Sequence, residues 1–241
     1  MEAPSRIAFI TGSGRRLGRQ LAFAFADAGY DIILHAHTSV DGMREAAAQV
    51  RNRGRRAFEL QGDLQKLGDV RRLAAEIAAL TPALDVLVNN AGVFPSAAFE
   101  DVTEETWDRA LDINCKSMFF MTQSLAPLLR AAKGCVVNLA SAGGFEPWKR
   151  HIPYNVSKSG VIMLTRGLAK ALAPDVRVNA VAPGIIIVPG EEVLDHIPAS
   201  RFPMQRYGTA QDLADAVLFL TEGTAYITGH VLPVTGGSAA V

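Results

Sequence analysis

Residues 11–18 read Thr-Gly-Ser-Gly-Arg-Arg-Leu-Gly, between an apolar run at 7–10 and an amphipathic stretch that reaches Ala28. Glycine lets a chain turn tightly and approach a pyrophosphate, and the N-terminus of a following helix favours the anion. The order of strand, glycine-rich turn and helix therefore predicts a dinucleotide-binding unit. The predicted contacts from this turn are Gly12, Ser13, Arg15, Arg16, Leu17 and Gly18. An ordinary strand-to-helix turn is the alternative, because Arg16 stands where a middle glycine would often be found.

The rest of the chain alternates apolar, β-branched runs with Ala- and Leu-rich amphipathic stretches. Strands without polar alternation are buried on both faces, and their alternation with helices indicates a parallel sheet with crossovers on both sides. We predict a single α/β domain over residues 1–241, a doubly wound parallel sheet of about seven strands in the order 3-2-1-4-5-6-7. The predicted strands are 7–10, 31–35, 56–60, 84–88, 135–139, 176–180 and 231–234. The predicted helices are 17–28, 41–53, 67–80, 104–132, 154–172 and 210–220.

One proline-rich segment, about 184–208, interrupts this alternation. A long connection of this kind is typical of a binding loop. We interpret it as a substrate lid with one short helix near 191–196.

The composition excludes several classes of function. The chain is 49% hydrophobic with a formal net charge of zero, so nothing global predicts binding to nucleic acid or to an acidic membrane. No apolar run is long enough to span a bilayer, and the first residues show no signal-peptide pattern. The two cysteines, Cys115 and Cys135, lack metal-site spacing and suit a reducing compartment. We therefore expect a soluble, cytoplasmic protein without a metal.

The end of the second predicted strand indicates which cofactor is preferred. A site that prefers NAD usually has Asp or Glu there, to accept hydrogen bonds from the ribose. Here the residues are His37, Thr38 and Ser39, with Arg15 close by in the first turn. Neutral and basic groups suit a 2′-phosphate, so NADP(H) is the predicted cofactor and NAD(H) the less favoured one. The alternative is that the histidine is a surface residue and the site does not discriminate.

A possible proton donor lies in the fifth predicted helix. Tyr154 and Lys158 are four residues apart, so their side chains share one helix face. A nearby ammonium favours phenolate and would lower the tyrosine pKa toward the range useful for proton transfer. Ser141 follows the fifth strand, at the edge where open α/β sheets bind ligands, and its hydroxyl could contact a substrate oxygen. The Tyr-x-x-x-Lys spacing alone is common, and it gains meaning only from the features around it.

Two further polar positions have both a structural and a functional interpretation. Asn114, inside a predicted helix, could simply form a helix–helix hydrogen bond, and Asp63 could cap the helix that follows it. Asn89-Asn90-Ala91-Gly92 ends the fourth strand, where small residues and amides could approach a nucleotide.

Taken together and in this order, these features resemble the short-chain dehydrogenase/reductase family from Thr11 to Gly237. The resemblance implies a Rossmann-type fold and a catalytic tetrad. Tyr154 would be the general acid/base, Lys158 would lower its pKa and hold the nicotinamide ribose, Ser141 would orient the substrate, and Asn114 would hold a water molecule in a proton relay.

The same resemblance implies further cofactor contacts and an assembly. Asp63 and Leu64 would border the adenine. Asn90, Ala91 and Gly92 would line the ribose side, and Pro183, Gly184 and Ile185 the nicotinamide. Most members of the family are homotetramers, with homodimers as the alternative.

Within the family, parts of the chain are similar to pteridine reductases. The shared features are Arg16-Leu17-Gly18, the stretch His35 to Ser39, and Phe94, which occupies the place of an aromatic residue that stacks on the pterin. Those enzymes often have Asp at the position of Ser141 and Arg at that of Thr38. In addition, Val188 replaces a Thr that many family members use to bind the carboxamide.

Three functions follow as hypotheses. The first is an NADP(H)-dependent carbonyl/alcohol oxidoreductase that acts on a small or 3-oxoacyl-type ketone. The second is a pteridine or dihydropteridine (C=N) reductase, and the third is a catalytically silent NADP-binding protein. Trp148, just before the catalytic helix, is the further predicted substrate contact, whereas Lys149 and Arg150 are more typical of a solvated loop.

Overall fold

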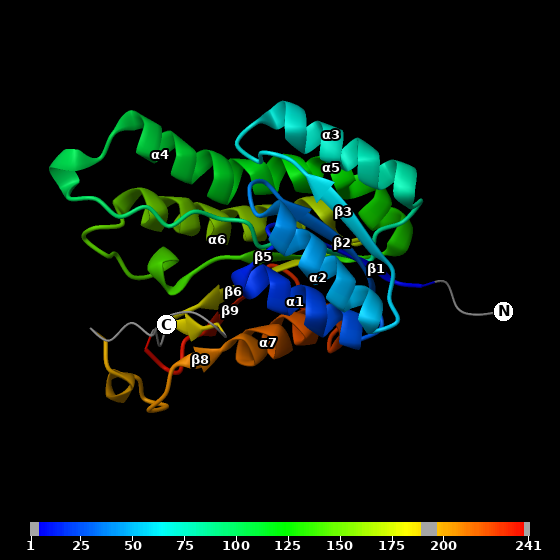
Figure 1. Ribbon diagram of the computed structural model, residues 1–241. Coiled ribbons are helices and arrows are strands. Elements are labelled where there is room, and N and C mark those ends of the chain that lie inside the picture. The colour runs from blue at the N-terminus through cyan, green and yellow to red at the C-terminus, as the bar shows by residue number, and fades with distance from the viewer. Residues whose placement is uncertain (1–4, 189–196, 239–241) are drawn as a thin grey trace.

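The computed structural model describes residues 5–188 and 197–238, which form a sheet covered by helices on both faces (Figure 1). Seven strands lie in the order β3-β2-β1-β4-β5-β6-β9, and every pair is parallel. Their bounds are β1 Ile7–Ile10, β2 Asp31–Ala36, β3 Ala57–Gln61, β4 Val86–Asn89, β5 Cys135–Leu139, β6 Arg177–Pro183 and β9 Val231–Val234. Because β9 is the seventh strand of this sheet in chain order, the predicted order is confirmed.

The helices form one layer on each face of the sheet. One layer contains α1 (Arg16–Asp27), α2 (Val40–Asn52) and α7 (Ala210–Glu222), and the other contains α3 (Leu67–Leu80), α5 (Ser117–Ala132) and α6 (Ile152–Leu172). The core is divided accordingly: Phe25 and Val217 pack in the first layer, and Ile77 and Leu129 in the second, all of them fully buried. Burial on both faces explains why the strands read as continuous apolar runs.

The predicted helix over 104–132 is interrupted. α4 (Glu104–Leu111) leads into a π-helical turn, Asp112–Lys116, before α5 begins. A π turn holds one extra residue and is frequently found at functional sites. Here it contains the fully buried Asn114, so the one-helix prediction missed the local distortion that places a candidate site residue.

The two ends of the segment predicted as a lid are hydrogen-bonded to each other. Two short strands, β7 (Ile186–Ile187) and β8 (Gly208–Thr209), pair in parallel as a separate two-stranded sheet. A 3₁₀ turn covers Ala199–Arg201. The predicted helix near 191–196 lies outside the described residues.

The strands of the main sheet bring the candidate residues to one edge. The glycine-rich turn follows β1, Asn90 follows β4, Ser141 comes two residues after β5, and Pro183 ends β6. Ligands of open α/β sheets bind at this carboxyl edge, near the point where strand order reverses between β1 and β4.

Candidate active site

The turn after β1 is shaped by backbone conformation. Gly12 has φ +67°, and a side chain on Gly14 would come within 2.6 Å of the Ser39 carbonyl oxygen. Arg16 also has a positive φ, +51°, which is the left-handed region that glycine usually supplies. The missing middle glycine is thus replaced by an arginine that takes up the same kind of conformation.

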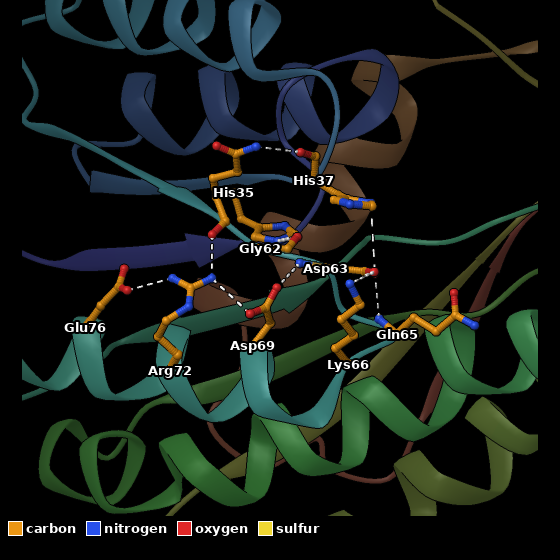
Figure 2. Close-up of polar contacts among 10 residues, drawn as sticks. His35, His37, Gly62, Asp63, Gln65, Lys66, Asp69, Arg72 and Glu76 are labelled. Atoms are coloured by element: carbon orange, nitrogen blue, oxygen red, sulfur yellow. Dashed lines mark hydrogen bonds and ion pairs between the residues drawn. The ribbon is translucent and has the colours of Figure 1, made fainter.

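The buried His35 ring connects this turn to the end of β3. Its Nδ1 accepts a hydrogen bond from the Gly12 backbone N–H at 3.1 Å, so Nε2 carries the proton. The Nε2 donates to the Gly62 carbonyl at 3.1 Å (Figure 2). Burial lowers the pKa of His35 to about 4, so the ring is neutral at neutral pH. Ser13 is also buried, and its Oγ accepts from the His35 backbone N–H at 2.9 Å.

A cleft opens above the turn and brings together most of the predicted cofactor contacts. Its empty volume is about 870 Å³, counting the part open to solvent. The lining residues named in the prediction are Gly12, Arg15, Arg16, Gly18, His37, Thr38, Ser39, Asp63, Leu64, Asn90, Ala91 and Gly92. Arg109 and Ile113 also line it and were missed by the sequence analysis; their i, i+4 spacing on α4 and the π turn is the signal that could have found them.

The charges of the cleft are mainly positive. Arg15, Arg16 and Arg109 line it, whereas Asp63 is the one carboxylate in the lining. The Asp63 Oδ1 lies 3.9 Å from His37 Nδ1 and accepts a hydrogen bond from the Gln65 backbone N–H at 3.1 Å (Figure 2). The end of β2, where a ribose-binding carboxylate would be expected for NAD, presents only His37, Thr38 and Ser39.

Ser141, Tyr154 and Lys158 meet at the adjacent end of the sheet. The Ser141 Oγ accepts from the Gly143 backbone N–H at 3.1 Å, and the Ser141 hydroxyl lies next to that of Tyr154. Lys158 is buried; its Nζ lies 5.8 Å from the centre of the Tyr154 ring and donates to the Leu139 carbonyl at 2.5 Å. Burial lowers the pKa of Lys158 to about 8.

The pKa of Tyr154 differs from the sequence-based expectation. Burial raises it, and the neighbouring Ser141 hydroxyl offsets that rise only in part. The Lys158 Nζ donates to the Leu139 carbonyl, and burial lowers the pKa of this ammonium as well. The lower pKa expected from the Tyr–Lys spacing is therefore not a property of these residues in the arrangement described here.

Asn114 connects two parts of the site. Its Oδ1 accepts from the Val93 backbone N–H at 2.8 Å, and its Nδ2 donates to the Val93 carbonyl at 2.9 Å and to the Ser157 Oγ at 3.0 Å. The Ser157 Oγ in turn donates to the Tyr154 carbonyl at 2.7 Å. Both amide hydrogens of Asn114 are thus used within the protein, and the side chain links the loop after β4 to the helix of Tyr154.

Comparison with known proteins identifies the family. A family model described as enoyl-(acyl carrier protein) reductase matches residues 12–239. A 3-oxoacyl-(acyl-carrier-protein) reductase of Staphylococcus epidermidis is 32% identical over 241 residues, covering 97% of this chain and 98% of the relative. The chain belongs to the short-chain dehydrogenase/reductase family. It is therefore an oxidoreductase by family.

Solved structures of this family share the whole fold. An acetoin dehydrogenase from Salmonella typhimurium superposes with a TM-score of 0.88 at 29% identity, covering 97% of this chain and 95% of that one. A blue fluorescent protein from a metagenomic library, solved in complex with NADPH, superposes with a TM-score of 0.89 at 30% identity, covering 98% of both chains.

An aromatic corner stands next to the tyrosine of this family member. Phe94 stacks on His151, with ring centres 4.1 Å apart, and meets Tyr154 edge to face at 4.6 Å. The Trp148 ring is nearly parallel to that of Tyr154, at 13° and 6.2 Å between centres, and lies edge to face with Phe94. The predicted substrate contacts Phe94 and Trp148 are thus brought together around Tyr154, and His151 joins them.

Several predicted cofactor contacts lie outside the lining of the cleft. Ser13 and Leu17 belong to the turn itself, and Tyr154 and Lys158 lie beside the cleft. Pro183, Gly184 and Ile185 leave the end of β6, where Gly184 N–H bonds to the Val234 carbonyl and the Ile185 carbonyl accepts from Gly208 N–H. Val188 is buried.

Residues 5–188 and 197–238 contain no group of three or more His, Cys, Asp or Glu side chains that could hold a metal ion. They also contain no helix with the length and apolar character needed to cross a membrane.

Proposed function

We propose that this protein interconverts a ketone and a secondary alcohol, with NADP(H) as the hydride carrier and Tyr154 as the general acid/base. The observation that carries the proposal is the convergence of three side chains: the Ser141 and Tyr154 hydroxyls lie next to each other, and the buried Lys158 is one helical turn from Tyr154. An acidic hydroxyl with a second hydroxyl beside it can both orient a carbonyl oxygen and protonate it.

The cleft fits a phosphorylated dinucleotide. A side chain on Gly14 would strike the Ser39 carbonyl, and one on Gly18 would strike the Gly12 carbonyl and the Asn90 amide, so only glycine fits at these places of the turn. Such a turn before a helix N-terminus suits a pyrophosphate. The guanidinium of Arg15 and the hydroxyls of Thr38 and Ser39 favour a 2′-phosphate over a bare ribose hydroxyl, which supports NADP(H).

In the reductive direction, the bound nicotinamide would supply the hydride to the carbonyl carbon. Tyr154 gives its phenolic proton to the carbonyl oxygen, and Ser141 holds that oxygen by a hydrogen bond. Lys158, which is buried on the same helix face, would donate a hydrogen bond to the ribose of the nicotinamide nucleotide. Asn114 acts here through position, because it connects Val93 to Ser157 and, through Ser157, to the backbone of Tyr154.

The substrate is proposed to be a small or 3-oxoacyl-type ketone. This rests on two similar proteins, a 3-oxoacyl-(acyl-carrier-protein) reductase and an acetoin dehydrogenase. A C=N reductase acting on pterins is the second candidate, favoured by the aromatic corner of Phe94 and Trp148. Ser141 opposes it, because protonation of a ring nitrogen suits an acid stronger than serine. The third hypothesis, a catalytically silent NADP-binding protein, does not explain why the Ser141 and Tyr154 hydroxyls lie next to each other.

We also propose that the enzyme acts in the cytoplasm as a homotetramer or homodimer. Apolar side chains exposed on α5 and α6, Phe119, Val156 and Met163, support a subunit interface there. Size-exclusion chromatography with light scattering measures the assembly.

The decisive experiment is an absorbance assay of NADPH oxidation with four substrate types: an acetoacetyl thioester, simple diketones, dihydrobiopterin and dihydrofolate. NADH is run in parallel. We expect turnover of ketones with NADPH. Turnover of the pterins alone would transfer the assignment to the C=N reductase, and NADPH binding without turnover of any member would support the silent protein.

A further inference from the structure

Asn155 lies directly after Tyr154, but its side chain faces the opposite way, into the loop between β5 and α6. It is 7% exposed. Nothing in the sequence distinguishes it, because a polar residue next to the tyrosine carries no signal of its own. In the structure its side-chain amide forms hydrogen bonds to the backbone of this loop.

One side-chain amide holds three points of this loop. The Asn155 Nδ2 donates to the Gly143 carbonyl at 2.6 Å and to the Glu146 carbonyl at 3.4 Å. The Oδ1 accepts from the Trp148 backbone N–H at 3.1 Å. The amide therefore uses both of its ends to fix the segment 143–148 onto the helix of Tyr154.

The packing around Gly143 is a second, independent sign of this attachment. A side chain on Gly143 would come within 2.7 Å of the Asn155 Nδ2 and within 2.9 Å of the Trp148 Cζ3. The indole, the amide and the glycine backbone are thus packed without spare space. Trp148 has its place because Asn155 and Gly143 lie beneath it.

Other contacts hold the loop on both sides of Trp148, and the His151 N–H bonds to the Trp148 carbonyl at 2.8 Å, whereas the Trp148 N–H bonds to the Asn155 Oδ1. The Ala97 backbone N–H bonds to the Arg150 carbonyl at 2.9 Å, and the His151 Nδ1 lies 2.8 Å from the Pro95 carbonyl oxygen. Ser159 donates to the Gly144 carbonyl at 2.8 Å. Loss of the Asn155 amide should loosen Trp148 while the fold and the other walls of the site remain.

We propose that Asn155 is a positioning residue that sets substrate specificity by holding the Trp148 ring against the Tyr154 side of the site. Groups of a substrate that extend beyond its carbonyl meet an indole at a fixed place, nearly parallel to the Tyr154 ring. This rests on the proposed ketone reduction for its kinetic consequence, whereas the attachment of the indole is independent of any reaction. Asp at this position would keep an acceptor for Trp148 but supply no donor to the Gly143 carbonyl.

The attachment is tested by fluorescence in a Trp107→Phe background, in which Trp148 is the only tryptophan. Asn155→Ala and Asn155→Asp should each give a red-shifted emission, a larger acrylamide quenching constant and lower anisotropy. Arg71→Ala, at an exposed position of α3, is the control and should leave all three unchanged. Unchanged emission and quenching in folded Asn155 variants would overturn the attachment.

The specificity is tested with a matched pair of ketones that differ only by a phenyl group in place of a methyl group. Asn155→Ala should lower kcat/KM for the phenyl ketone about tenfold, mainly through KM, and that for the methyl ketone by less than about threefold. The Kd for NADPH should not change. An equal loss for both ketones would overturn the specificity role.

Gly143→Ala provides a second route if the Asn155 variants do not fold. It pushes the amide and the indole apart from the other side and should give the same red shift and the same selective loss. Failure of the proposed function remains distinguishable: the fluorescence changes would then occur in a protein that turns over neither ketone.

Discussion

The cofactor end and the carbonyl end of the site are held together by different kinds of contact. At the cofactor end, the turn after β1 depends on backbone conformation and on His35, which bridges Gly12 and Gly62. At the carbonyl end, Asn114 and Asn155 tie loops after β4 and β5 to α6 through their side-chain amides. The cofactor end is thus built around the backbone of one turn, which side chains from β2 and the loop after β4 hold in place, whereas the carbonyl end depends on two side-chain amides that hold loops onto α6.

This difference predicts that the two ends can be damaged separately. The largest effect should come from Tyr154→Phe, which removes the proton donor and leaves the cleft walls in place. We expect kcat to fall by about 10²–10⁴-fold, the usual worth of a positioned general acid. The Kd for NADPH, measured by its fluorescence on binding, should stay within about threefold because the phosphate turn is untouched. A variant with turnover close to that of the unaltered enzyme would remove Tyr154 from the mechanism.

The next effect concerns the cofactor end and its dependence on pH. His35 has its pKa lowered from 6.5 to about 4 in the folded protein, so protons bind preferentially to the unfolded chain. The stability that the neutral ring contributes is fully present above about pH 6.5 and is lost as the pH falls toward about 4. Between about pH 7.5 and about pH 5, the free energy of unfolding should fall by about 2 kcal/mol from this group alone.

Urea unfolding of the unaltered protein and of His35→Gln at both pH values isolates that contribution. Glutamine can accept from Gly12 and donate to Gly62 but does not titrate. The pH-dependent loss should be smaller in the variant by the amount stated. Parallel losses in the two proteins would mean that His35 is not the group that titrates.

The smallest effect concerns cofactor choice. Arg15→Ala and Ser39→Ala should each weaken NADPH about tenfold, the worth of one hydrogen bond to a charged group, and weaken NADH by much less. Arg44→Ala is the control, because Arg44 pairs with Asp41 on the exposed side of α2 and does not line the cleft. Equal losses of both cofactors would refute a contact with the 2′-phosphate.

The same contrast explains what could be predicted from the sequence. The strand order and the phosphate turn follow from apolar runs and glycine positions, which are local signals. The π turn around Asn114 has no such signal, so one continuous helix was predicted over 104–132. The direction of the Tyr154 pKa shift could not be derived from the Tyr–Lys spacing, because it is set mainly by the burial of the tyrosine, which depends on tertiary packing.

The residues that were missed share one property. Arg109 and Asn155 reach the site only through tertiary packing, from α4 and from the helix that follows β5. By contrast, Arg15, Thr38 and Ser39 stand at strand ends, where sheet topology alone brings side chains together.

The central claim is hydride transfer to a carbonyl, and isotope transfer tests it most directly. NADPH carrying two deuterium atoms on the reactive nicotinamide carbon is incubated with a ketone that the enzyme consumes, and the alcohol is analysed by mass spectrometry. The account predicts one deuterium, bound to the former carbonyl carbon, in the product of the unaltered enzyme, and almost no product from Tyr154→Phe. An alcohol without deuterium, or equal yields from both proteins, would contradict it.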